Sequence, residues 1–379
     1  MITRLISFVV AVLLLSATTM VGAQTVVDQT LFLTFVPNIQ FAPVYVAIEK
    51  GYFADVGINL SIIHGDEPLG VDLIAAGEHQ FGIISGEQII AARANARPVT
   101  FVYEWFQHYP IALVTPNTSG IESVADMVGR RVGVPGRFGA TYSGLIAMLT
   151  ANNLTESEID LREIGFNAPE VICVGGVDAA AVYVNNEPLV LENLAAAGDC
   201  GDVTGINVFP VADFVDIVSN GLITNEDTIE NDPELVRSMV SAFDHGLRDV
   251  LNNPAEAYLI SSEYIDNLPM TDELRAALEN VTAMSDSLFM TTPEPSLEDF
   301  RGYRDALRIE LGASLDAEIS LQMNVLLTSS DLWQGDDALG YTDPESWVTT
   351  AETLITMGFL DEIGDLSGAY TNVFLPETE

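Results

Sequence analysis

Apolar residues in the first hundred positions fall into short runs that alternate with longer amphipathic stretches. The short runs predict strands, and the longer stretches, where apolar residues recur at helical spacing, predict helices. Strands are expected at residues 31–36, 58–63, 81–84 and 99–105, and helices at 41–53, 69–76 and 86–94. Such alternation of strand and helix predicts a mostly parallel sheet with helices on both faces.

The same alternation restarts around a turn-rich stretch at residues 116–120. Strands are expected at 111–114, 131–134, 161–164, 179–183 and 208–211, and helices at 124–128, 139–151, 169–175 and 187–197. Residues 214–223 read as a strand that leads back to the first unit. From Glu226 onward the chain is predicted to be helical. Pro233 and Pro254 each open a helix, because proline is favoured in the first helical turn.

These elements predict an α/β protein with two lobes, two crossovers and a helical C-terminal tail. We expect the first lobe at residues 24–115, the second at 116–215, and the return to the first lobe with the tail at 216–379. Open α/β sheets bind ligands beyond the carboxyl ends of their strands. Both lobes are therefore expected to face one cleft, which hinge closure would wrap around a ligand.

The N-terminal segment reads as an export signal rather than as part of the fold. Arg4 precedes a mostly apolar run at residues 5–15, and Val21-Gly22-Ala23 has the form of a cleavage site. The mature chain is then expected to begin at Gln24. No later apolar run is long enough to span a membrane, so we expect an exported, soluble protein, periplasmic or otherwise extracytoplasmic.

The net charge of the chain excludes some classes of binding partner. The 379 residues include 55 Asp and Glu against 14 Lys and Arg, which gives a formal net charge of −41, and Lys50 is the single lysine. A surface this acidic repels phosphate backbones and anionic lipids. Nucleic-acid binding is therefore excluded, and the acidic surface serves solubility.

Chemistry-bearing motifs are few. Cys173 and Cys200 either pair in an oxidising compartment or are separate buried residues. Two cysteines and four widely spaced histidines do not form a metal cluster, and no zinc-protease, Cys-x-x-Cys or Gly-x-Ser-x-Gly motif is present. We expect no resident metal or cofactor.

Several short motifs in order resemble one family, over residues 31–258. They are Pro43-Val44-Tyr45-Val46-Ala47, Glu49-Lys50-Gly51-Tyr52-Phe53, Ala75-Ala76-Gly77-Glu78, Val132-Gly133-Val134-Pro135-Gly136, Val177-Asp178-Ala179-Ala180 and Asn185-Asn186-Glu187-Pro188. The chain resembles the solute-binding proteins of ABC importers, in the branch that binds thiamine-pyrimidine precursors and riboflavin and, more distantly, nitrate and alkylsulfonates.

That resemblance implies the periplasmic-binding-protein type II fold and a monomer without catalysis. It implies capture of a planar heteroaromatic vitamin or precursor in the cleft, closure of the lobes, and delivery to an ABC permease in the membrane. Residues 35–43 and the Asn-Asn-Glu-Pro run look most like riboflavin-binding members, so riboflavin is favoured. Pyrimidine-binding members carry a histidine in the first loop, where this chain has Gln40 and Phe41. A pyrimidine-precursor binder and a nitrate or alkylsulfonate binder are the alternatives.

The family that the chain resembles also includes an enzyme, the yeast pyrimidine-phosphate synthase. It depends on a cysteine-rich iron site and on a lysine-linked pyridoxal phosphate. This chain has two cysteines and only Lys50, which we expect at the exposed end of a helix. A synthase activity is therefore not expected.

A planar heterocycle is held by stacking on its faces and by hydrogen bonds at its edge. Residues of both kinds follow the expected strands, and we select Asn38, Gln40, Phe41, Ser85, Glu87, Trp105, Gly139, Ala140, Thr141, Tyr183, Asn186 and Glu187 as ligand-binding candidates. Trp105 would stack. The free N–H groups of residues 139–141, at a helix N-terminus, would hold a carbonyl oxygen or an anion. Asn186 and Glu187 would bind the ligand edge. Replacing Trp105 or Asn186 by Ala should weaken binding without unfolding the protein.

Structural roles compete for several of these positions. Asn38 is equally a turn residue, Ser85 a helix cap and Trp105 a core residue. In the second loop, Asp66 and Glu67 either line the cleft or cap the following helix.

Two other classes of function are weighed against binding of a neutral heterocycle. A secreted hydrolase would need an oriented nucleophile, and the sequence offers only an unsupported pairing of Ser85 with His64. An anion binder would use Arg137 beside the helix N-terminus, but the acidic loops carrying Glu67, Glu87 and Glu187 would repel an anion.

Overall fold

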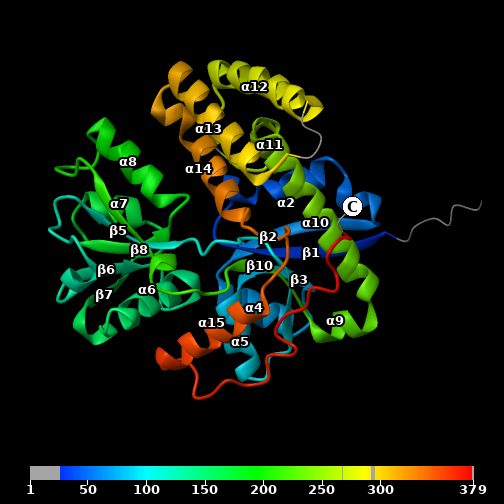
Figure 1. The fold of residues 1–379 in the computed structure, drawn as a ribbon, viewed down its shortest axis with the longest axis horizontal. Coiled ribbons are helices and arrows are strands. Elements are labelled where there is room, and N and C mark those ends of the chain that lie inside the picture. The colour runs from blue at the N-terminus through cyan, green and yellow to red at the C-terminus, as the bar shows by residue number, and fades with distance from the viewer. Residues whose placement is uncertain (1–25, 267, 292–294, 378–379) are drawn as a thin grey trace, which may run out of the picture.

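Two five-stranded sheets, each covered by helices, form two lobes that lie side by side (Figure 1). The computed structural model describes residues 26–266, 268–291 and 295–377. The expected leader and its cleavage point lie outside these residues. The predicted α/β class, with two lobes, two crossovers and a helical tail, is confirmed.

In the first lobe the strand order is β2 (Ile58–Gly65), β1 (Val27–Thr34), β3 (Phe81–Ser85), β10 (Asn220–Asn225) and β4 (Val99–Glu104). β1 pairs in parallel with β2 and β3, whereas β10 is antiparallel to β3 and β4. The sheet is mixed: the two pairings made by β1 are parallel, as predicted, and the two made by the reversed strand β10 are antiparallel. β3 and β10 are buried along their whole length, as expected for strands covered on both faces.

Helices from both halves of the chain cover this sheet. One face carries η1 (Ile39–Phe41), α2 (Ala42–Glu49), α3 (Tyr52–Asp55) and α10 (Pro233–Asn252), and the other carries α4 (Glu67–Ala75), α5 (Gly86–Ala94) and α15 (Pro344–Thr356). The single helix predicted at 41–53 is broken, because Gly51 takes a left-handed conformation with φ +81°. A side chain at Gly246 would overlap the Pro43 carbonyl, so this glycine lets α10 pack closely on α2.

The second lobe has the strand order β7 (Asp160–Glu163), β6 (Arg131–Val134), β8 (Ala179–Tyr183), β5 (Ile111–Pro116) and β9 (Ile206–Pro210). Its helices are η2 (Val124–Met127), α6 (Gly139–Ala151), η3 (Glu156–Glu158), α7 (Ala168–Cys173) and α8 (Glu187–Ala197). Cys173 and Cys200 form a disulfide that ties the end of α7 to the segment after α8. The expected first segment ended at residue 115, but β5 pairs with β8 and β9, so the chain enters the second sheet earlier.

The strand predicted at residues 214–223 is wrong in its first half. η4 (Val211–Asp213) precedes an irregular stretch, and β10 begins only at Asn220. Ile217 packs in the core of the second lobe, and Val218 packs in the core of the first. The apolar pattern there arises because this crossover contributes to two cores in turn, not because it forms one face of a sheet.

The C-terminal part is helical as predicted, and Pro233 and Pro254 lie in the first turns of their helices. Its remaining helices are α9 (Glu226–Asn231), α11 (Pro254–Ser261), α12 (Asp272–Thr291), α13 (Leu297–Ser314) and α14 (Ala317–Trp333). α14 descends to the junction of the lobes (Figure 1) and contacts both η1 and α8. Among the described residues, no helix combines the length and apolar character needed to cross a bilayer.

Candidate functional site

A cleft lies between the two sheets, and its walls come from loops at the carboxyl ends of strands in both lobes. The space between its lining residues, including the part open to solvent, is about 820 Å³. Nine of the predicted candidates line it together: Gln40, Phe41, Trp105, Gly139, Ala140, Thr141, Tyr183, Asn186 and Glu187. Strand ends from separate sheets therefore do meet at one site, as the topology predicts.

The other three candidates are not among the cleft-lining residues. Asn38 caps η1, and its side chain accepts a hydrogen bond from the Gln40 N–H at 3.0 Å. Ser85 and Glu87 are buried, and the Ser85 hydroxyl donates to a Glu87 carboxylate oxygen at 2.9 Å. The structure therefore places these three predicted residues outside the cleft wall, with Asn38 and Ser85 hydrogen-bonded within the protein and one Glu87 carboxylate oxygen buried without a partner.

The Ser85–His64 pairing that a hydrolase would need is not formed. Ser85 donates to Glu87, and His64 Nδ1 lies 3.1 Å from the Phe35 carbonyl oxygen. Burial lowers the pKa of His64. The described residues also contain no cluster of His, Cys, Asp and Glu suited to a metal ion.

Trp105 lines the cleft but is mainly a core residue. Its side chain is 1% exposed. The ring packs against Phe41, Phe106, Phe243 and Trp333 at centroid distances of 6.0, 4.9, 5.6 and 5.5 Å. Replacing such a residue by Ala costs about 3–5 kcal/mol of stability, so the expectation that Trp105→Ala leaves the fold intact is corrected.

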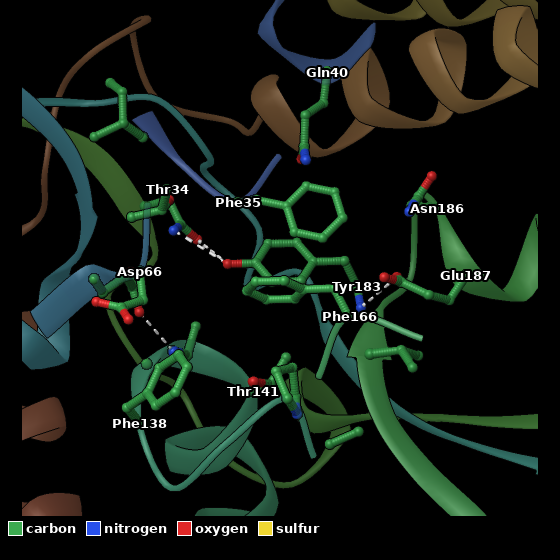
Figure 2. A pocket seen from close by; sticks show the side chains of 18 of the residues that line it. Thr34, Phe35, Gln40, Asp66, Phe138, Thr141, Phe166, Tyr183, Asn186 and Glu187 are labelled. Atoms are coloured by element: carbon green, nitrogen blue, oxygen red, sulfur yellow. Dashed lines mark hydrogen bonds between the residues drawn. The ribbon is translucent and has the colours of Figure 1, made fainter. Parts of the chain in front are cut away.

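Two aromatic residues at the centre of the cleft were not anticipated. Phe35 follows β1 in the first lobe and Phe166 follows β7 in the second, and their rings meet edge to face at 4.9 Å (Figure 2). Phe166 is 44% exposed. Phe35 has a φ of +78°, a costly conformation for a residue other than glycine that is found mostly where the surroundings require it. An aromatic residue just beyond a strand end was the available signal.

Polar groups surround these rings (Figure 2). Gln40 points down toward the Phe35 ring, and Asn186 and Glu187 lie on the side of the second lobe. The Glu187 carboxylate accepts a hydrogen bond from the Tyr183 N–H at 3.1 Å, and burial raises the pKa of Glu187. The Tyr183 hydroxyl reaches Asn220 of the first lobe at 3.3–3.4 Å.

Asn185, in the same polar run, points away from the cleft. It is buried, and its amide donates to the Ser329 hydroxyl of α14 at 2.8 Å. This hydrogen bond ties the second lobe to the helical tail. The dense polar cluster after β8 is thus divided, with Asn186 and Glu187 at the cleft and Asn185 inside the protein.

Glu67 crosses between the lobes. Its carboxylate accepts a hydrogen bond from the Ser85 N–H at 2.8 Å and another from the Ala140 N–H, in the first turn of α6, at 2.9 Å. Asp66 is the N-cap of α4, and its side chain accepts from the Leu69 N–H at 3.0 Å, so the capping alternative holds for it. Both residues nevertheless line the cleft.

Glu67 and Glu87 form a buried acidic pair around Ser85. Burial raises the pKa of Glu87 to about 8, and the nearby Glu67 adds to the rise. Burial also raises the pKa of Glu67, while hydrogen bonds from Ser85 and Ala140 oppose that rise. Two backbone N–H groups stabilise the ionised Glu67, so we assign the negative charge of the pair to Glu67 and the proton to Glu87.

The cation expected for an anion binder is engaged elsewhere. Arg137 forms ion pairs with Glu156 and, at 3.4 Å, with Glu163. It is exposed and is not a cleft-lining residue. The cleft wall at α6 therefore presents the Glu67 carboxylate rather than a guanidinium.

Comparison with known proteins identifies the family. The family model described as NMT1/THI5 like matches residues 38–257, more than half of the chain. The chain belongs to this NMT1/THI5-like family. It is 32% identical over 363 residues to a riboflavin-binding protein of Chloroflexus aurantiacus, which covers 94% of this chain and 88% of that protein.

A more distant relative has the name of an enzyme. A 4-amino-5-hydroxymethyl-2-methylpyrimidine phosphate synthase of Legionella pneumophila is 28% identical over 232 residues, covering 60% of this chain and 71% of that one. Among solved structures, the periplasmic aliphatic sulphonate binding protein of Escherichia coli superimposes with a TM-score of 0.56 at 13% identity, covering 93% and 94% of the two chains. The expected periplasmic-binding-protein fold is confirmed, and so is the resemblance to ABC solute-binding proteins.

Proposed function

We propose that this protein is the extracytoplasmic solute-binding component of an ABC importer, and that it captures a planar, uncharged heteroaromatic ligand, with riboflavin favoured. One observation carries the proposal: aromatic rings from both lobes meet at the centre of a cleft whose edge holds amide and carboxylate groups. The riboflavin-binding relative at 32% identity supports the choice of ligand.

The chemistry of the cleft suits a flavin ring. Phe35, Phe166 and Tyr183 supply faces and edges on which a flat ring packs. The isoalloxazine ring of riboflavin has an imide N–H between two carbonyl groups at one edge. Glu187 would accept from the N–H, and the amides of Gln40 and Asn186 would donate to the carbonyls.

Binding without catalysis fits this chain better than a synthase does. The single lysine, Lys50, is held in ion pairs with Asp249 at 3.0 Å and Glu256 at 2.8 Å, and it is not a cleft-lining residue. Cys173 and Cys200 are joined to each other. The residues that would bind a pyridoxal cofactor or an iron ion are therefore occupied in other roles.

Capture would proceed by closure of the lobes. The cleft is bridged by Glu67 with Ala140, by Tyr183 with Asn220 and by the Phe35–Phe166 contact. An open form would expose the aromatic rings, and ligand binding would draw the lobes together before delivery to the permease. The ligand-binding roles of the nine cleft-lining candidates are part of this proposal, as are a monomeric state and removal of residues 1–23 during export.

Titration with riboflavin tests the function. Free riboflavin is fluorescent, and stacking on aromatic rings should quench it with a Kd of roughly 1 µM or tighter. Phe166→Ala should raise the Kd roughly 2–10-fold, because it removes one exposed ring of the cleft. Phe214→Ala is the matched control, since Phe214 is 37% exposed but lies outside the cleft.

Failure of quenching, together with no change in melting temperature when riboflavin is added, would contradict the riboflavin proposal. The pyrimidine-precursor alternative would then be tested with an aminopyrimidine as the titrant, because Glu187 also suits an exocyclic amine.

A further inference from the structure

The Glu67 carboxylate, in the wall of the cleft, makes a contact outside its own helix and its own lobe. Glu67 is the first residue of α4, yet it reaches the other lobe and accepts from the Ala140 N–H at 2.9 Å. The side chain is only 6% exposed. Its second oxygen accepts from the Ser85 N–H at 2.8 Å, so both oxygens are fixed by backbone donors.

Helix α6 depends on this residue for its N-terminal cap. Its N-cap residue, Phe138, has no side-chain acceptor, and the N–H groups of a first turn lack partners within the helix. The N-terminus of a helix of this length attracts anions. Glu67 therefore supplies, from the first lobe, the acceptor that α6 lacks.

Gly139 is shaped for the same contact. It has a φ of +70°, and a Cβ at this position would lie 2.4 Å from a Glu67 carboxylate oxygen. A side chain here would both strain the backbone and displace the carboxylate. Two features of the fold, the uncapped helix and the glycine, thus converge on the Glu67 carboxylate.

We infer that Glu67 is a specificity-determining residue that closes the α6 N-terminus to anions, so that the cleft accepts ligands uncharged at this end. The inference deepens the proposed function and rests on it for the nature of the natural ligand. A free anion at α6 would have to displace a carboxylate held by two backbone N–H groups or lie beside its negative charge. Both are unfavourable in a buried site.

Anion titration of variants tests this role without riboflavin. Sodium sulfate and sodium methanesulfonate are titrated by calorimetry at constant ionic strength into the wild type, Glu67→Ala, Glu67→Gln and Asp66→Asn. Glu67→Ala frees two backbone N–H groups and should bind the anions at least tenfold more tightly than the wild type. Glu67→Gln keeps one acceptor oxygen and should gain at least threefold.

Asp66→Asn is the matched control. Asp66 is adjacent, lines the same cleft and loses one negative charge on substitution, but it makes no bond to α6. It should bind anions like the wild type, which separates occupation of the helix N-terminus from a general change in charge. Combining Glu67→Ala with Ala140→Pro removes the N–H in question and should abolish the gain.

Circular dichroism and melting temperatures establish that each variant is folded, and Glu67→Gln carries the test if Glu67→Ala does not fold. Equal anion affinity in the wild type and in the folded Glu67 variants would overturn the inference, as would an equal gain in Asp66→Asn. These outcomes do not depend on riboflavin titration of the wild type, so this inference and the proposed function can fail separately.

Discussion

The tripeptide Glu-Pro-Leu occurs in both lobes, at residues 67–69 and 187–189, each time in the first turn of a helix that follows a strand. Locally the two are equivalent: the glutamate opens the helix and proline lies in its first turn. The environments differ. Glu67 is buried and bonds across the lobes to Ala140, whereas Glu187 is half-buried, bonds to Tyr183 of its own lobe and faces the cleft.

The difference shows that this motif places a glutamate at the first position of a helix but does not decide which group its carboxylate binds. Opposite Glu67 lies the uncapped start of α6, which needs an acceptor. Opposite Glu187 lies the cleft with its aromatic rings. The first glutamate is therefore expected to act in closure and selectivity, and the second in ligand binding.

Replacing Glu187 should have the largest effect on affinity. Glu187→Gln leaves one acceptor oxygen for two donors, the Tyr183 N–H and the ligand N–H. It should weaken riboflavin binding roughly 10–100-fold, because a lost hydrogen bond to a charged group costs about 1.5–3 kcal/mol. Fluorescence quenching gives the Kd. Glu67→Gln, the counterpart in the other lobe, should change it less than Glu187→Gln does, and the reverse order would contradict the division of roles.

Stability should respond in the opposite order. Glu67→Ala leaves the buried N–H of Ser85 without an acceptor, which costs about 1–3 kcal/mol, so the melting temperature should fall by roughly 3–8 °C. In Glu187→Ala the freed Tyr183 N–H lies beside the open cleft, where water can reach it. A fall at Glu187→Ala as large as that at Glu67→Ala would remove the distinction between buried and cleft-facing carboxylates.

The buried acidic pair of Glu67 and Glu87 predicts that the stability of the protein depends on pH. Burial and the neighbouring Glu67 raise the pKa of Glu87 to about 8. Between its ordinary value of 4.5 and 8, the folded state holds a proton that the unfolded chain has released. The free energy of unfolding must then decrease as pH rises through this range.

Titratable groups on several helices, strands and loops lie near Glu87. They are Glu67 of α4, Tyr109 in the crossover and Tyr183 of β8, with Ser85 and Gln88 as hydrogen-bonding neighbours.

In Glu87→Gln the fall in melting temperature between pH 5.5 and 8.5 should be smaller than in the wild type by roughly 3 °C or more. The exposed Glu192→Gln serves as control and should keep the wild-type slope; an unchanged slope in Glu87→Gln would show that Glu87 holds no such proton.

The smallest effect on stability is expected for substitution of Asp66, the residue before Glu67. Asp66→Asn should shift the melting temperature by less than about 2 °C, because Asn and Asp cap a helix N-terminus equally well. Thermal melts check this. A large loss would mean that the Asp66 charge, and not its capping oxygen, supports the start of α4.

Much of the architecture follows from local pattern. β3 and β8 are read correctly because each is a short buried apolar run, and Pro254 marks the start of α11 by a purely local rule. The crossover containing Ile217 and Val218 was misread, because its alternation comes from two cores that meet only in the folded protein.

The sequence was enough to place a residue at the cleft where a strand end alone decides its position, as for Tyr183 and Glu187. The sequence was not enough where partners distant along the chain decide how a side chain is used. Trp105 is surrounded by rings that include Phe243 and Trp333, and Asn185 is bound by Ser329. Phe166 was overlooked because its position after a strand is only a weak signal, and its contact with Phe35 of the other lobe forms only in the folded protein.

The sequence by itself determined the alternation of strands and helices, the helical tail, the acidic surface and the resemblance to a family of binding proteins. Only the tertiary structure decided which polar groups are free for a ligand and which are used within the protein. Propensity and periodicity act over neighbouring residues, whereas the pairing of Glu67 with Ala140, 73 positions apart, exists only once two separately built sheets meet.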